Sequence, residues 1–244
     1  MIKKDKPDLI LSEVLIGIRF QRRWHTLDIL GKITDDILHN PKSPFYKDYF
    51  TEIVQQSLGR ELANKKTKCF LRLDIDNLIF KHVLNKQEDV LVNKDLSWFY
   101  NESEKYIVHE ILARYNFEQI NRIGLVYYYE IPKEDVSLEL IRRLSGKLQG
   151  ELAKFSLDFH KKSPIEQALA IKGVDDYINI IHFIKSKDDN TYEAGIDYQH
   201  YFSPSIDKIA EFDLKRFFNV SKHYLEEAFN GWLLEKMRIV DPEK

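Results

Sequence analysis

Alternating apolar and polar residues predict most of the β-strands of this chain. Residues 9–20 (LILSEVLIGIRF) are typical of a buried strand, and residues 120–132 (INRIGLVYYYEIP) of another that ends at a proline. Residues 68–84 alternate regularly, which favours a half-buried strand that turns at Asp76 and Asn77 into the next one. Further strands are expected at residues 88–93, 152–160, 165–171, 177–185 and 192–202.

Apolar residues spaced three and four positions apart predict the helices. They are expected at residues 23–40, 96–115, 136–148 and 213–237, with Asp95 and Asp213 as N-caps of the second and the last. The pattern between residues 41 and 67 is less regular. Its apolar positions favour one short amphipathic helix built on Phe45, Tyr46, Tyr49, Phe50, Ile53 and Val54.

The order of these elements predicts an α+β protein. Two related halves, residues 1–118 and 119–244, are each expected to form an antiparallel sheet with helices packed on one face, within one globular unit. The first strands of the halves share a short pattern, IGIRF at 16–20 and IGLVY at 123–127, which favours an internal duplication. Gly17 and Gly124 would then mark equivalent places where another backbone comes close. The alternative is two unrelated strands that each tolerate a glycine.

Composition and charge narrow the class of protein. Hydrophobic residues make up 43% and charged residues 31% of the 244, a balance typical of folded globular chains. With a net charge of −2, the protein as a whole does not attract polyanions, although this charge is compatible with a local basic patch. A single cysteine, Cys69, cannot form an intrachain disulfide. Together with the absence of a long apolar run or signal-peptide pattern, this predicts a cytoplasmic protein that does not bind membranes.

The common signatures of enzymes are absent from the sequence. It contains no glycine-rich phosphate loop, no G-x-S-x-G elbow, no H-E-x-x-H motif and no zinc-finger spacing. We therefore assign no catalytic residue and no cofactor from the sequence, and a non-enzymatic role is favoured over an enzymatic one.

One basic segment carries candidate chemistry. The string RFQRRWH places Arg19, Arg22, Arg23, Trp24 and His25 at the end of the first predicted strand. Arginines bind phosphates, an aromatic ring stacks on a base and a histidine moves protons, so the segment is a candidate for RNA binding or metal-independent RNA cleavage. The alternative interpretation is a charged strand end, with Trp24 packed into the core.

Two carboxylates form a second, weaker candidate. Asp74 and Asp76 are two residues apart in a predicted strand, so they would project from the same face and together could hold Mg²⁺. The alternation of residues 68–84 equally explains them as part of a solvent-facing surface beside Arg72.

Four segments, taken in order, resemble a known family. They are the opening strand LSEVLIGIRF, the tryptophan-containing helix at residues 95–115, the central NRIGLVYYYEIP, and the ending YEAGIDYQHYF followed by SKHYLEEAFNGWLLEKM. These are similar to a sporadically distributed prokaryotic family of proteins of about this length, whose central strand reads Arg-Ile-Gly-Leu-Arg-Tyr. Here Val126 replaces the second arginine, and Gly195-Ile196-Asp197 stands where the family often has Asp-x-Asp. The resemblance implies no catalytic residues, and the scattered distribution of the family is that of mobile defence or toxin-linked genes.

Three functional hypotheses follow from the sequence. The first is a non-catalytic binding or assembly protein, with a protein partner or self-association, as in a subunit of a bacterial defence or toxin-linked system. The second is an RNA-binding protein or endoribonuclease that uses the segment from Arg19 to His25. The third is a metal-dependent enzyme at Asp74 and Asp76.

Overall fold

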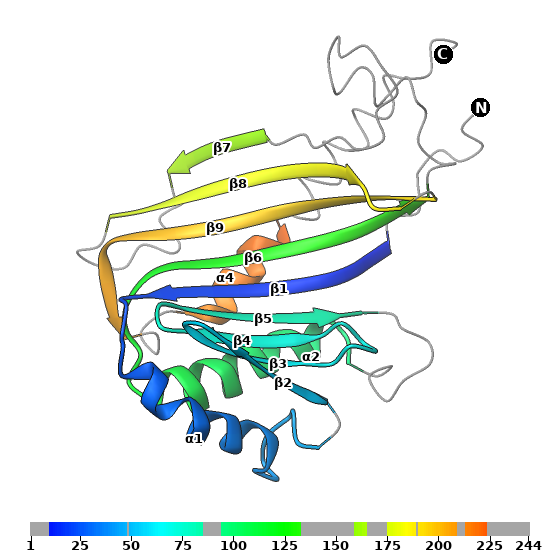
Figure 1. The fold of residues 1–244 in the computed structure, drawn as a ribbon. Coiled ribbons are helices and arrows are strands. Elements are labelled where there is room, and N and C mark those ends of the chain that lie inside the picture. Colours follow the sequence, from blue (N-terminus) through cyan, green and yellow to red (C-terminus); the bar gives the residue numbers. More distant parts are fainter. Residues whose placement is uncertain are drawn as a thin grey trace, which may run out of the picture.

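A computed structural model shows a mixed α and β protein built on one antiparallel sheet (Figure 1). The structure describes residues 10–47, 49–84, 94–132, 159–164, 175–188, 190–208 and 213–223. Within them the sheet has nine strands in the order β2-β3-β4-β5-β1-β6-β9-β8-β7. The predicted α+β class with antiparallel strands is therefore confirmed.

Strands β1, β4, β5, β6, β8 and β9 lie where the apolar patterns predicted strands, whereas β2 and β3 were not predicted and β7 overlaps only the end of the strand predicted at 152–160. Their bounds are β1 Ile10–Phe20, β2 Glu52–Gln56, β3 Gly59–Ala63, β4 Phe70–Asp74, β5 Asn77–Val83, β6 Glu118–Pro132, β7 Phe159–Pro164, β8 Asp175–Ser186 and β9 Thr191–Lys208. The predicted turn at Asp76 and Asn77 lies between β4 and β5. The helices are α1 Thr26–Leu38, α2 Leu96–Glu102, the π-helix η1 Ser103–Ala113, and α4 Leu214–His223.

A single sheet spans both predicted halves, where the sequence suggested one sheet for each. The first strands of the halves pair with each other, and Gly17 lies directly opposite Gly124 in the β1–β6 register. On either side of this pair each half places its last described strand next to its first, β5 beside β1 and β9 beside β6. The predicted duplication itself stays a prediction.

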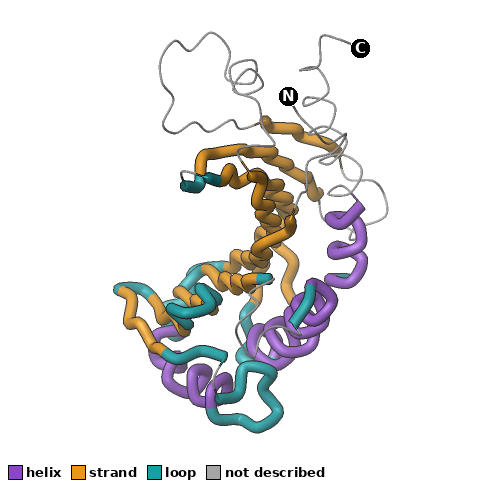
Figure 2. Tube along the Cα trace, turned by 90° about the vertical axis from the view of Figure 1, so that its right-hand side faces the viewer, coloured by secondary structure: helices purple, strands orange, loops and turns teal. Residues whose placement is uncertain are grey.

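The described helices all lie on one face of the sheet. Figure 2 shows that the sheet curves and that its concave face carries none of them. Side chains alternate between the two faces along β1, and Val14, Ile16 and Ile18 on one face are fully buried. Gly17 and Arg19 project from the concave face, where they are half-buried and exposed.

Aromatic side chains and buried hydroxyls bind the helices to the sheet. Phe45 contacts the rings of Phe80 and Trp98, with centroids 5.2 and 6.2 Å away. On the other side of the core, the hydroxyl of Tyr127 on β6 lies 2.6 Å from that of Tyr100 on α2 and 3.0 Å from that of Ser221 on α4. Three elements from both halves thus share one polar contact in an apolar core.

The short helix predicted between residues 41 and 67 is wrong. Residues 52–63 form the hairpin of β2 and β3, and β3 joins the sheet through β4. Phe45 and Phe50 are buried before the hairpin, whereas Ile53 and Val54 are exposed on the edge strand. The misleading pattern arose because two kinds of apolar residue, core and edge, follow each other at helical spacing.

Other predictions are confirmed only in part, or concern residues outside the described ranges. The helix at 96–115 is present with Asp95 as its N-cap, accepting the backbone N–H of Trp98 at 2.8 Å, but its second half is a π-helix. The predicted elements at 88–93, 136–148 and 165–171 lie outside the described residues, as do residues 152–158 and 224–237. Among the helices that the structure describes, none is long and apolar enough to cross a membrane.

Candidate functional site

A pocket of about 670 Å³ opens where β1 ends and β6 begins, at the left end of the sheet in Figure 1. It is lined by Arg19, Phe20, Gln21, Arg22, Asp76, Asn121, Arg122, Tyr201, Phe202 and Ser203. The lining residues come from both halves of the chain. Three of them are arginines, and one of the three, Arg122, belongs to the second half.

Irregular pairing of the central strands creates the space for this pocket. Arg19 pairs with Arg122, but the next pair on β1 is Phe20 with Ile120, so β6 carries an extra residue, Asn121. In the β6–β9 ladder the register also shifts here, because Arg122 pairs with Tyr201 while Ile120 pairs with Ile206. Such bulges re-aim side chains and are common next to binding sites.

Arg19 and Arg122 place two positive charges opposite each other. They are direct partners in the β1–β6 register, and like charges in this position destabilise a sheet. Within the described part of the chain neither guanidinium lies within ion-pair distance of a carboxylate, and the Nε atom of Arg122 is buried without a hydrogen-bond acceptor. Arg122 does interact electrostatically with Asp197 on β9: burial raises the pKa of that carboxyl, and the charge of Arg122 opposes the rise. The guanidinium of Arg122 lies 5.9 Å from the centre of the Tyr201 ring.

Arg22 adds a third positive charge at the rim of the pocket. Its guanidinium lies 3.4 Å from the carboxylate of Asp76, and 58% of its side chain is exposed. With three guanidinium groups and this single carboxylate, the lining of the pocket is positive by two charges. A ligand that fits this pocket should therefore be an anion.

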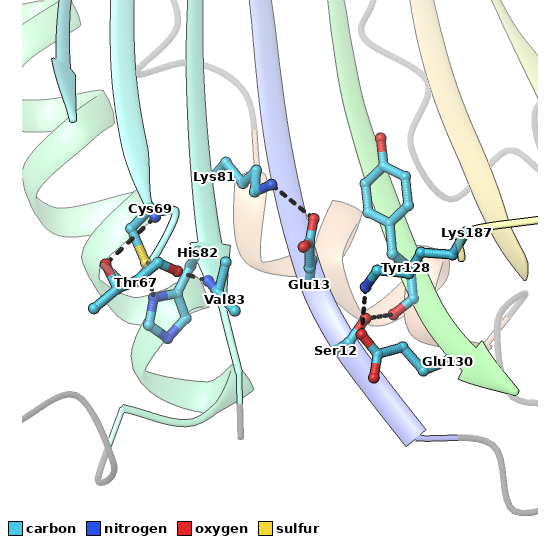
Figure 3. A network of polar contacts seen from close by, with 10 residues as sticks. All are labelled: Ser12, Glu13, Thr67, Cys69, Lys81, His82, Val83, Tyr128, Glu130 and Lys187. Atoms are coloured by element: carbon cyan, nitrogen blue, oxygen red, sulfur yellow. Dashed lines mark hydrogen bonds and ion pairs between the residues drawn. The ribbon is translucent and has the colours of Figure 1, made fainter. Parts of the chain in front are cut away.

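The charges at the opposite end of the concave face are paired. Lys81 lies 2.8 Å from Glu13 across β5 and β1, and Lys187 contacts Glu130 at the end of β6 (Figure 3). Tyr128 projects between these two ion pairs in the same view. At the pocket, by comparison, Arg22 pairs with Asp76 and Arg122 interacts with Asp197, whereas Arg19 is not within ion-pair distance of a carboxylate in the described residues.

Arg23 has a structural role, although the sequence grouped it with the candidate site. It donates to the backbone carbonyl of Asn116, and its guanidinium lies 5.5 Å from the centre of the Phe117 ring. These contacts fasten the start of α1 to the segment that enters β6. Arg23 does not line the pocket.

Trp24 and His25 also lie outside the pocket lining. Trp24 is 60% exposed, so the alternative that packed it into the core is wrong. The reason is that it occupies the turn before α1, ahead of the first core-facing residue of the helix, Thr26. The Nδ1 atom of His25 lies 3.2 Å from the carboxylate of Asp28 on the exposed surface of α1.

Asp74 and Asp76 have different partners. The carboxylate of Asp74 accepts from Nε of Arg72 at 2.8 Å, at the end of β4, while Asp76 lies in the turn and pairs with Arg22. No group of three or more His, Cys, Asp or Glu side chains suited to a metal occurs in the described ranges. A metal site at these two residues stays a prediction.

A buried thiol and imidazole form a separate polar cluster on β4 and β5 (Figure 3). The Sγ atom of Cys69 lies 3.8 Å from Nδ1 of His82, and Nδ1 accepts from the hydroxyl of Tyr49 at 2.8 Å. The Nε2–H group of His82 donates to the carbonyl of Lys94 at 2.7 Å. Burial lowers the pKa of His82 to about 4. Because both side chains are fully buried, the cluster serves the core and is closed to substrates.

A second pocket of about 540 Å³ lies between α1 and the α2–η1 helix. Lys42, Lys105 and Arg114 line it together with Glu102 and Glu110. Arg114 already contacts Asp36 at 3.3 Å and Glu110 at 3.9 Å. Because the lining here is positive by one charge and Arg114 is already paired, the first pocket, positive by two, is the stronger candidate for an anion site.

Arg122, Asn121 and Tyr201 are pocket residues that the sequence did not identify. One signal could have found Arg122, since Gly17-x-Arg19 and Arg122-x-Gly124 are reversed patterns. If the two glycines face each other on antiparallel strands, the two arginines must do so as well. Tyr201 has no comparable signal. No known protein-family model and no curated protein matches this chain, so the site rests on its geometry.

Proposed function

We propose that this is a non-catalytic binding protein whose concave sheet face binds single-stranded RNA at the arginine pocket. One observation carries the proposal. Arg19 and Arg122 face each other, neither within ion-pair distance of a carboxylate in the described residues, and a phosphate between them would relieve this opposition of like charges. Arg22 supplies a further positive charge at the rim of the same pocket.

The surroundings favour a nucleic acid over a free inorganic anion. Tyr201 provides an aromatic ring next to Arg122, and bases stack on such rings and on guanidinium planes. The asparagine and glutamine of the pocket, Asn121 and Gln21, supply amides that can bond to base edges or ribose hydroxyls. Because the whole chain has a net charge of −2, binding depends on this local patch.

The test is fluorescence anisotropy of a labelled single-stranded RNA titrated with the protein at low salt. We expect the double variant Arg19→Ala/Arg122→Ala to bind at least about tenfold more weakly, because two charge-assisted contacts are lost. Arg216→Ala removes an exposed arginine from α4, on the helix-bearing face, and is the matched control with unchanged affinity.

The salt dependence separates phosphate contacts from loss of folding. Each phosphate contact contributes about −0.7 to the slope of log K against log salt for a single strand, so Arg122→Ala should reduce the slope by about that amount. Absence of RNA binding at low salt would overturn the proposal. So would equal affinity of the wild type and the double variant, or tighter binding of an acidic peptide than of RNA.

The relation between the two halves is also a proposal. The pocket would lie at the junction of two duplicated units, each with its first strand next to its last. The opposition of Gly17 to Gly124 and of Arg19 to Arg122 supports this view, because a two-fold relation between the halves brings equivalent strands together.

Self-association through β2 is a second candidate function, in keeping with an assembly role. β2 is an edge strand of the described sheet, its residue Ile53 is 55% exposed, and Val54 and Leu58 are exposed beside it. Edge strands with such residues pair readily with another strand. In antiparallel self-pairing centred on Val54, Glu52 would face Gln56, so no like charges would meet.

Light scattering over a range of protein concentrations tests this second function. The wild type should form a dimer, and Ile53→Lys should shift it to a monomer because a charge blocks the edge. Thr51→Lys, which alters an exposed residue just before the strand, is the control. A wild-type monomer at all concentrations would remove the candidate.

A further inference from the structure

The centre of the concave face carries a small patch of bare backbone at Gly17, next to the arginines. Gly17 and Gly124 are direct partners on β1 and β6, one pair along from Ile18 and Ile123 and two from Arg19 and Arg122. A Cβ atom at position 17 would meet no other atom within 4 Å, so the described residues leave the space directly above Gly17 open. Peptide groups lie roughly in the plane of a sheet, so a planar ring can lie flat on them where no side chain intervenes.

The bare patch has borders on each side. Ile79 on β5 is the partner of Gly17 on the side away from β6. Gln199 on β9 covers Gly124, because its amide occupies the place that a side chain there would need. Leu15 and Val126 form the next pair on the same face, away from the arginines. The bare backbone is thus confined to Gly17 and is about one strand spacing wide, about 4.8 Å. It has apolar residues at one end and the arginines at the other, and on the β9 side Gln199 donates to the carboxylate of Asp197.

We infer that this patch is a subsite for a nucleobase, which lies flat over Gly17 while its phosphate binds Arg19 and Arg122. The inference rests on the proposed RNA-binding function and adds the position of the base. A base and its 5′ phosphate lie a few ångströms apart, which matches the two residue steps along β1 from Gly17 to Arg19, about 6.6 Å. The apolar end, with Leu15 and Val126, supports the ring edge without competing for the phosphate.

Gly17→Val tests the subsite with little risk to the fold. A β-branched residue suits a strand, and the added atoms enter empty space, so the circular dichroism spectrum and thermal midpoint should match those of the wild type. Gly17→Ala is the smaller companion variant. Gly31→Ala is the matched control, because Gly31 on α1 also has free space at its Cβ position.

Two probes of equal length and charge are compared by anisotropy, an oligouridylate and its abasic counterpart. The wild type should bind the oligouridylate about tenfold more tightly, a difference within the range of base stacking. Gly17→Val should lower the affinity for oligouridylate to the abasic level and leave the abasic probe unchanged, with Gly17→Ala in between. Gly31→Ala should behave like the wild type.

The outcomes separate the subsite from the proposed function. Equal affinity of the wild type for both probes, or an unchanged preference in a folded Gly17→Val, would overturn the subsite while the arginine pocket stands. If neither probe binds the wild type, RNA binding itself fails and the subsite fails with it. A preference abolished by Gly17→Val but also by Gly31→Ala would contradict a local role of Gly17.

Discussion

At the scale of single residues, the arginines of the pocket and the buried histidine differ in how their polar groups are satisfied. Arg19 and Arg122 carry opposed charges that form no ion pair within the described residues and therefore suit an anionic ligand. His82 is fully buried and both of its ring nitrogens are hydrogen-bonded, so it remains neutral and supports the core. The arginines at the pocket therefore indicate a binding site, whereas the hydrogen-bonded His82 has a structural role.

Arg19→Ala should stabilise the unliganded protein while it weakens RNA binding. Removing one of two opposed like charges relieves a repulsion of about 0.2–1 kcal/mol. Urea denaturation at low salt measures the free energy of unfolding, and added salt should narrow the gap between variant and wild type because it screens the repulsion. A less stable variant would contradict the unfavourable opposition of the two arginines.

His82 should make the protein less stable as the pH falls from about 6.5 to about 4. Its pKa is about 4 in the folded state, so over that window the unfolded chain binds more protons than the folded one. The loss should reach about 3 kcal/mol between pH 7 and pH 4. Urea denaturation at several pH values measures it against His82→Gln, whose stability should approach that of the wild type as the pH falls. Parallel curves would show that His82 does not titrate in this window.

At the scale of elements, one hydroxyl couples three of them. Tyr127 on β6 lies within hydrogen-bond distance of Tyr100 on α2 and Ser221 on α4. The ring of Tyr100 also stacks on Phe218 of α4, with centroids 4.4 Å apart. Helices from the two halves are therefore held against the same strand and against each other.

Tyr127→Phe should lower the free energy of unfolding by about 1–3 kcal/mol. The ring still fills its place in the core, but two buried hydroxyls lose a partner. Thermal and urea denaturation measure the change. Tyr46→Phe, at an exposed position, should leave stability unchanged and serves as the control. A Tyr127→Phe variant as stable as wild type would mean that the hydroxyls find other partners.

At the scale of the whole molecule, the pairing of β1 with β6 makes one sheet out of two halves. The predicted boundary between residues 118 and 119 falls at the start of β6, within the structure that joins the halves. β1 is a central strand with a partner on each side, β5 and β6. The pocket also needs both halves, because Arg19 and Arg122 come from different ones.

Residues 1–118 expressed alone should not form a stable domain. Without β6 the apolar strand β1 becomes an edge, and the core loses Leu125 and Tyr127, which pair beside Ile16 and Val14. Nuclear magnetic resonance of the fragment should show poor dispersion, which mixing with residues 119–244 should restore. A well-dispersed spectrum of residues 1–118 alone would show instead that each half folds independently.

The sequence by itself determined the strands and helices with strong local periodicity. β1, the turn between β4 and β5, the N-cap at Asp95 and the strand β6 all follow from side-chain alternation or local hydrogen bonding. It failed at residues 41–67, where core and edge residues mimic a helical pattern and only pairing with β4 decides the outcome. It also placed Arg19 and Arg22 in the candidate site, but with Arg23, Trp24 and His25, which the fold directs elsewhere.

Only the tertiary structure decided which residues meet across the sheet. The register of β1 against β6 sets Arg19 opposite Arg122 and Gly17 opposite Gly124, residues more than a hundred positions apart. Bulges at Asn121 and beyond Tyr201 then open the pocket. Register and bulges depend on long-range pairing between strands, which the periodicity of one segment does not encode. Local order could therefore be predicted from the sequence, whereas the site required the fold.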